Sequence, residues 1–301
     1  KMAYRYKLGN KSYEKAETRA AFILLFPTIV ALVFLFFIPA LRVFSLSFTD
    51  TNTITNVSKF VGLANFRYLF KSQVFLKSMR NTFVFTTAKL SAEIAISLAL
   101  AVMLDAKIPF RKFLRITYFA PVVVPVVASS TIWLWLYAPT FSPLNQILQF
   151  IGLQPLKWIY SADTALFSII LFSVWRGIGY DVVVFLSGLQ EIPDSVIEAA
   201  RVDGGNGWNI FWRVKLPLLK PVIAFVLIMG LIGSFQAFTE VDVMTPNGGP
   251  KNSTLLMVNY IYQQAFGNTK MGRGAAASLV LFAIIFFFTY LQRVMHDRMG
   301  D

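Results

Sequence analysis

The sequence predicts an all-α membrane protein with about six transmembrane helices. Its composition is 56% hydrophobic and only 14% charged, whereas soluble domains carry about 25% charged residues. The 301 residues include 30 phenylalanines, more than a soluble fold of this size can bury. Six segments are long and apolar enough to cross a bilayer, which takes about 20 residues. They cover residues 20–44, 82–104, 116–137, 165–189, 221–239 and 275–292.

The first apolar segment, residues 20–44, is expected to stay in the mature chain as a span. It is too long for the apolar part of a signal peptide and lacks an obvious small-residue cleavage site. Lysine and arginine are more frequent in the connections on the side of the two termini, which the positive-inside rule assigns to the cytoplasm. We therefore expect a cytoplasmic N-terminal segment (1–19), a five-helix core (82–292) and a cytoplasmic tail (293–301).

The second and fourth spans carry charged residues. A charge that faces lipid at a helix centre costs about 2.5 to 3.5 kcal/mol, so these side chains must face protein or water. In the second span, Lys89 and Glu93 are four residues apart and can form an ion pair along one helix. In the fourth span, Arg176 and Asp181 either pair internally or take part in a site.

The third and fourth spans hold candidates for a solute path. Pro121 and Pro125 free backbone carbonyls, which must then face protein or a wet cavity, and Ser129 follows them. The motif WRGIGYD places aromatic rings beside a charged group and two glycines. A sugar site uses an aromatic ring for stacking and polar groups that orient the hydroxyls. The candidates in this motif are Trp175, Arg176, Gly177 and Tyr180.

The fifth span has one face of small residues. They follow the spacing i, i+3, i+4, i+7, which places them on one side of a helix. Such a face either packs closely against another membrane helix or leaves room for a ligand, and the sequence leaves both open. The residues are Gly230, Gly233, Ser234 and Ala237.

A polar segment, EAARVDGGNGWNIFWRVKLP, separates the fourth and fifth spans at residues 198–217. The pattern predicts a short helix over 198–203, ended by Gly204 and Gly205, and a second over 208–214, ended before Pro217. Aromatic residues beside basic ones in a loop favour burial by a partner or by lipid. The segment has carboxylates but no nucleophile or metal-ligand set, so a catalytic loop is disfavoured.

Several classes of function are excluded by what the chain lacks. It has no cysteine and one histidine, His296, which disfavours zinc clusters and Ser-His or Cys-His catalytic pairs. It has no GxxxxGK[S/T] loop, so it is not expected to bind ATP in the Walker manner. The net charge of +13 is scattered between apolar runs, which disfavours nucleic-acid binding.

The polar segment resembles the EAA signature of membrane subunits of bacterial ABC importers, with Val214 where isoleucine is usual. FVGLANFRYLF, WRGIGY, SFQAF and GGP also resemble the maltose-type carbohydrate permeases. The resemblance implies a type I ABC importer permease fold in the bacterial cytoplasmic membrane, with residues 191–217 as the coupling loop. In that loop it assigns ATPase coupling to Glu198, Ala199, Ala200, Asp203, Gly204, Leu216 and Pro217.

The same resemblance implies a set of partners. These are a second, similar permease subunit, two ATPase subunits, an extracytoplasmic solute-binding protein and membrane lipid. ATP and Mg would be bound by the ATPase partner, and this chain would bind no cofactor. The resemblance also favours the small-residue face and Arg176, Gly177 and Tyr180 as lining of the solute path. That face consists mostly of glycine and alanine, whereas maltose-type permeases have polar side chains there. The identity of the substrate therefore stays open.

Alternatives to a sugar permease follow from the same residues. A membrane-embedded transferase acting on a lipid-linked sugar would use Arg176, Asp181 and Glu240. A passive channel would give flux without ATP. Arg176 and the positive charge also fit uptake of an anionic solute, such as glycerol phosphate or a sugar acid. The sequence does not distinguish a homodimeric from a heterodimeric pair of permease subunits.

Overall fold

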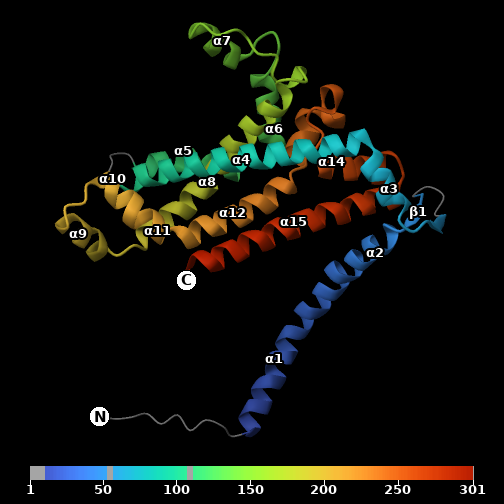
Figure 1. Ribbon diagram of the computed structural model, residues 1–301, viewed down its shortest axis with the longest axis horizontal. Helices are drawn as coiled ribbons and strands as arrows, with labels where there is room; N and C mark the ends of the chain where they lie inside the picture. The colour runs from blue at the N-terminus through green and yellow to red at the C-terminus, as the bar shows by residue number, and fades with distance from the viewer. Residues whose placement is uncertain (1–10, 53–56, 107–110, 301) are drawn as a thin grey trace.

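The computed structural model describes residues 11–52, 57–106 and 111–300 and is almost entirely helical. Four helices are long and apolar enough to cross a membrane, and two bent helix pairs raise the number of candidate spans to six. This agrees with the predicted all-α membrane fold. Figure 1 shows the long helices running along the body of the molecule, with one helical arm above it and the first span below.

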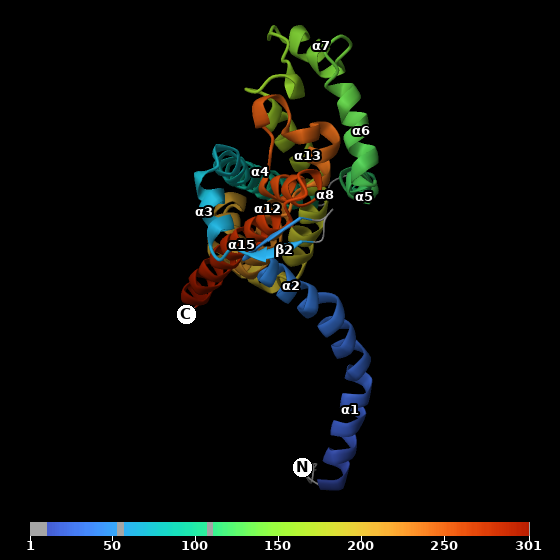
Figure 2. The same cartoon turned by 90° about the vertical axis from the view of Figure 1, so that its right-hand side faces the viewer.

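The first span is continuous, and all of it except its last turns, which contact α15 (Met271–Gly300), stands apart from the bundle. It consists of α1 (Lys11–Leu32), a π-helical turn η1 (Val33–Phe37) and α2 (Ile38–Leu46). None of its apolar stretch is buried within the chain, and Figures 1 and 2 both show α1 pointing away from the other helices. Its apolar surface is therefore left for lipid or another subunit. Residues 1–10 of the predicted N-terminal segment lie outside the described residues.

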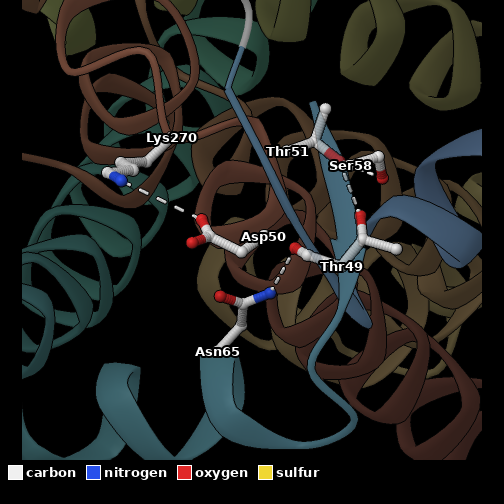
Figure 3. A network of polar contacts seen from close by, with 6 residues as sticks. All are labelled: Thr49, Asp50, Thr51, Ser58, Asn65 and Lys270. Atoms are coloured by element: carbon white, nitrogen blue, oxygen red, sulfur yellow. Dashed lines mark hydrogen bonds and ion pairs between the residues drawn. The ribbon is translucent and has the colours of Figure 1, made fainter. Parts of the chain in front are cut away.

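A hairpin connects the first span to the bundle. Strands β1 (Thr49–Thr51) and β2 (Ser58–Phe60) are antiparallel, and helix α3 (Ala64–Lys71) follows. In α3, the Asn65 amide donates hydrogen bonds to the carbonyls of Ser47 and Thr49, both at 2.9 Å. Figure 3 shows Asn65 below the strands and Lys270 facing Asp50. The Lys270 ammonium lies 3.9 Å from the Asp50 carboxylate. These contacts fix the end of the first span to the rest of the molecule.

The body of the bundle contains α4 (Gln73–Asp105), α8 (Ala165–Gln190), α12 (Lys220–Phe235) and α15 (Met271–Gly300). Helix α4 packs along α8 and also against α12, which in turn contacts α15. Glycines permit the close approaches. A Cβ on Gly230 of α12 would lie 2.4 Å from a Leu90 methyl carbon of α4. Small residues at helix interfaces are typical of membrane proteins.

The predicted third span, residues 116–137, is two helices instead of one. Helices α5 (Arg111–Val123) and α6 (Val126–Leu136) meet at 101°. Pro125 stands at the break with an extended backbone, because proline lacks an N–H and disfavours the helical conformation of the preceding residue. Figures 1 and 2 show α6 rising from the body to α7 (Pro143–Phe150) at the tip of an arm.

The base of this arm is an aromatic cluster. The Tyr137 and Trp158 rings stack with centroids 4.9 Å apart, and Trp133 packs on Phe172 of α8. The Trp158 indole donates a 2.8 Å hydrogen bond to the Asn145 side-chain oxygen. Trp158 belongs to the short turn η2 (158–160), so the cluster fastens α6, α7 and α8 together.

The fifth span is shorter than predicted. Helix α12 ends at Phe235, and α13 (Thr239–Met244) restarts the chain in another direction after a turn. Short turns η4 (Pro246–Gly248) and η5 (Pro250–Asn252) then lead to α14 (Met257–Tyr262). A π-helical turn, η6 (263–267), joins α14 to α15. The predicted helix over 221–239 is therefore wrong for its last residues, where Gln236 closes the helix instead.

We predict that Gly179→Ala destabilises the contact between α5 and α8. A Cβ at Gly179 would lie 2.1 Å from the Tyr118 carbonyl oxygen, a backbone atom that cannot rotate away. Overpacking of this kind costs about 1–3 kcal/mol. We expect a thermal midpoint several degrees lower by circular dichroism in detergent. The control is Gly233→Ala, because a Cβ there has no neighbour within 4 Å. Equal midpoints for the two variants would contradict the packing described.

Candidate functional site

The segment between α8 and α12 forms an exposed helical hairpin, which we call the coupling hairpin (residues 191–218). Its first helix is α9 (Asp194–Val202), which starts four residues earlier than predicted and ends beside Gly204. Gly204 has φ +83°, a conformation that other residues adopt only with strain. The Gly205 N–H donates to the Ala200 carbonyl at 2.9 Å, which closes the helix end.

The second half of the hairpin runs as one bent helical stretch through α10 (Gly207–Ile210), η3 (Phe211–Lys215) and α11 (Leu216–Leu218). The predicted helix end before Pro217 is wrong. Pro217 falls in the first turn of α11, after the π-helical turn, where its missing N–H is tolerated. This stretch meets α12 at 64°.

Most of the predicted coupling residues lie on the surface of this hairpin. Those that are exposed are Glu198, Ala199, Asp203, Gly204 and Pro217, while Ala200 and Leu216 are half-buried. The aromatic residues beside them are also uncovered: Trp208 is 69% exposed and Trp212 48% exposed. The hairpin therefore offers both polar and apolar groups to a partner.

A charge contact joins the hairpin to the bundle. The Lys215 ammonium lies 2.6 Å from the Asp105 carboxylate at the end of α4, and both side chains are about four-fifths buried. Leu219, at the bend into α12, is fully buried. A cavity of about 870 Å³ separates the hairpin from the ends of α4 and α8, and Glu198 and Arg201 are among its lining residues. The sequence analysis missed Asp105, because nothing local marks a partner 110 residues away.

A second cavity lies between the middles of the spans. Its volume is about 240 Å³. Helices α4, α8 and α12 supply its walls, through Lys89, Glu93, Gly177, Tyr180, Asp181, Met229, Gly230 and Gly233. The predicted path residues Gly177, Tyr180, Gly230 and Gly233 are thus brought together around one space.

The charged lining of this cavity is ordered by one ion pair. The Lys89 ammonium lies 2.5 Å from the Glu93 carboxylate, which confirms the expected pairing along α4. Glu93 occupies the space that Gly177 leaves open, since a Cβ there would lie 1.4 Å from its carboxylate oxygen. The sequence analysis gave Lys89 and Glu93 no role beyond their pair and missed their place in this wall.

The remaining predicted path residues do not line this cavity. Trp175 packs against Trp133 in a tilted arrangement, with ring centroids 5.2 Å apart. Arg176 forms no ion pair with Asp181, and its buried Nε has no hydrogen-bond partner within the described part of the chain. The Ser129 hydroxyl donates to the carbonyl of Val126 at 3.0 Å, within its own helix.

The small-residue face is divided by the end of α12. Ser234 is buried, with a hydroxyl that has no partner among the described residues. Ala237 lies beyond the helix and belongs to the aromatic core with Trp133. Gly230 packs against α4, whereas Gly233 is open. The face therefore combines both functions left open by the sequence, close packing at one residue and free space at another.

No group of histidine, cysteine, aspartate and glutamate side chains suited to a metal ion occurs among the described residues. What the geometry offers is a cavity between spans with charged side chains in its wall, and an exposed hairpin at the ends of the spans. The family described as "Binding-protein-dependent transport system inner membrane component" matches residues 93–301. The chain belongs to this family.

Relatives of this permease are transport subunits. This permease is 32% identical over 272 residues to the arabinooligosaccharides transport system permease protein AraP of Bacillus subtilis (strain 168). The match covers 90% of this chain and 86% of AraP. The chain is 31% identical over 274 residues to the sn-glycerol-3-phosphate transport system permease protein UgpA of Pectobacterium atrosepticum, covering 90% and 92%. These matches confirm an ABC importer permease and give no support to a transferase.

A solved structure confirms the fold of the permease. The crystal structure of a bacterial ABC transporter involved in the import of the acidic polysaccharide alginate contains a chain that superposes with a TM-score of 0.84. The match covers 97% of this permease and 100% of that chain, at 19% identity. This likeness confirms the importer permease fold that the sequence predicted.

We predict that Asp105→Lys loosens the coupling hairpin. Two ammonium groups would then face each other at the Lys215 contact. A partly exposed ion pair contributes about 0.5–1 kcal/mol to the stability of the closed hairpin. Its loss therefore raises the population of the opened hairpin about two- to fivefold. We expect trypsin to cleave after Arg201 and Arg213 correspondingly faster in detergent. The exchanged pair Asp105→Lys with Lys215→Asp should restore the native rate, and continued fast cleavage in it would exclude a direct charge contact.

Proposed function

We propose that this chain forms half of the translocation path of an ATP-driven carbohydrate importer and that its coupling hairpin docks on a separate ATPase subunit. The observation that carries this proposal is the exposed hairpin, with Glu198 on its surface and a buried bend into α12 behind it. Exposed tryptophans outside the apolar layer are costly unless a partner covers them. Trp208 and Trp212 would be covered by such an ATPase.

The way in which the hairpin is attached supports transmission of movement. It continues into α12 through a 64° bend and is tied to α4 by the Lys215–Asp105 pair. A push on the hairpin would therefore reach α4 and α12, two of the three helices that line the cavity between the spans. Small shifts of packed elements are a common means of switching between two arrangements. In this proposal ATP and Mg are bound by the ATPase partner, and this chain binds no cofactor.

Two further partners fit the surfaces that the fold leaves open. A second permease subunit, identical or similar, would cover the first span, whose apolar stretch is not buried within this chain. An extracytoplasmic binding protein would deliver the solute to the end of the bundle that carries the β1–β2 hairpin and α14, opposite the coupling hairpin (Figure 1). With that arrangement, both termini lie in the cytoplasm.

A carbohydrate is supported by the chemistry around the cavity between the spans. Tyr180 supplies an aromatic ring and carboxyl groups supply hydrogen-bond acceptors, a combination suited to sugar hydroxyls and ring faces. The names of the relatives cover an arabinose oligosaccharide and glycerol 3-phosphate, so they leave the charge of the solute open.

Glu198→Lys should abolish solute-stimulated ATP hydrolysis, because it reverses the charge at the proposed contact with the ATPase. The measurement is ATPase activity of the complete transporter in lipid, with its binding protein and a panel of sugars. We expect stimulation in the native transporter and less than a tenth of it in the variant. The variant must insert and assemble normally, as judged by the amount of complex recovered.

The matched control is Asp163→Lys, which also turns a negative charge into a positive one, at an exposed residue outside the coupling hairpin, in the turn before α8. It should leave stimulation within about twofold of native, since surface charges away from a contact contribute little. Equal stimulation in Glu198→Lys would contradict docking through this hairpin. Solute flux without ATP would favour a channel instead.

A further inference from the structure

The cavity between the spans holds a carboxyl group without a partner. Asp181 of α8 is only 7% exposed and lines the cavity. It has no hydrogen bond or ion pair within the described part of the chain. A buried polar group normally has its hydrogen bonds satisfied, and at this depth the cost of leaving one unsatisfied is high. Asp181 therefore points to a visiting group that donates hydrogen bonds.

The neighbouring charges do not neutralise Asp181. The only ammonium in the lining belongs to Lys89, which is already paired with Glu93 at 2.5 Å. One cation and two carboxyl groups thus face the space. A further cation, Arg176 of α8, is not among the lining residues. The walls consequently present acceptors for hydroxyl groups and an unfavourable environment for a negatively charged group.

The charged residues Lys89, Glu93 and Asp181 lie in the middle of the proposed path. Lys89 stands at the midpoint of α4, and Asp181 stands within one turn of the midpoint of α8. With about 240 Å³, the cavity is somewhat smaller than the usual range for ligand sites, which begins at about 300 Å³. It would accept one sugar unit at a time.

We infer that this cavity accepts an uncharged polyhydroxy solute and discriminates against one that carries a carboxylate or phosphate, with Asp181 as the residue that sets the selection. The inference rests on the proposed function, since it requires a solute to pass between these spans. Discrimination arises from repulsion of the unwanted ligand as well as attraction of the accepted one. This inference disagrees with the uptake of an anionic solute, which Arg176 and the net charge favour when they are considered alone.

The experiment compares sugars that differ only in one charge. Binding of D-galactose against D-galacturonate, and of D-glucose against D-glucuronate, is measured on the complete transporter in lipid nanodiscs. The binding protein is left out so that its own selectivity does not enter. We expect the neutral member of at least one pair to bind about tenfold or more tightly than its acid.

Asp181→Asn keeps the size of the side chain and an acceptor oxygen but removes the charge. In this variant the preference for the neutral sugar over its acid should fall to less than about threefold, because the acid is no longer repelled by the charge. The control Asp163→Asn alters an exposed carboxylate in the turn before α8. The stretch of α8 from Ala165 to Asp181, which separates it from the cavity, is about 24 Å long. Asp163→Asn should leave the preference for the neutral sugar unchanged. A general effect of losing one negative charge would instead lower this preference in both variants.

Three outcomes would overturn the inference. They are equal or tighter binding of the acid to the native transporter, an unchanged preference in Asp181→Asn, and no binding of any of the four sugars. None of them affects the ATPase test of Glu198→Lys, so the importer function and the charge selection stand or fall separately.

Discussion

The structure depends on how charged groups are kept away from lipid in the middle of the bundle. Glu93 and Lys89 neutralise each other, and the pair fits between α4 and α8 because Gly177 has no side chain. An ion pair with nowhere to fit would force the helices apart or expose charge to lipid, at a cost of several kcal/mol. The close packing of α4 against α8 and the cavity with charged residues beside them therefore have the same origin.

Cavity and coupling hairpin are linked through the same helices. From Glu93 to the end of α4 at Asp105 is about 18 Å, and from Asp181 to the end of α8 at Gln190 is about 14 Å. Helix α12 begins at the hairpin and reaches the cavity at Gly230. All three helices that line the cavity thus end beside the hairpin, so a displacement at the hairpin has a short, rigid route to the solute path.

Much of this could be predicted because it is encoded locally. Apolar length identified the spans, and the glycines at 204 and 205 identified the turn of the hairpin. The failures have physical causes that lie in tertiary packing. Pro125 stands at a break of 101°, whereas Pro27 lies inside a helix that stays continuous. The Lys215–Asp105 pair and the wall formed by Glu93 and Asp181 join residues far apart in sequence, and no spacing rule indicates them.

The most direct test of the central contact is a comparison of Gly177→Ala in two backgrounds. In the native chain the new methyl group would collide with the Glu93 carboxylate, so we expect a thermal midpoint in detergent several degrees lower, as for overpacking that costs about 1–3 kcal/mol. In a chain that already carries Lys89→Met and Glu93→Ala, the same substitution should cost little. An equal loss in both backgrounds would contradict the account, because Gly177 would then be needed for a reason other than space for Glu93.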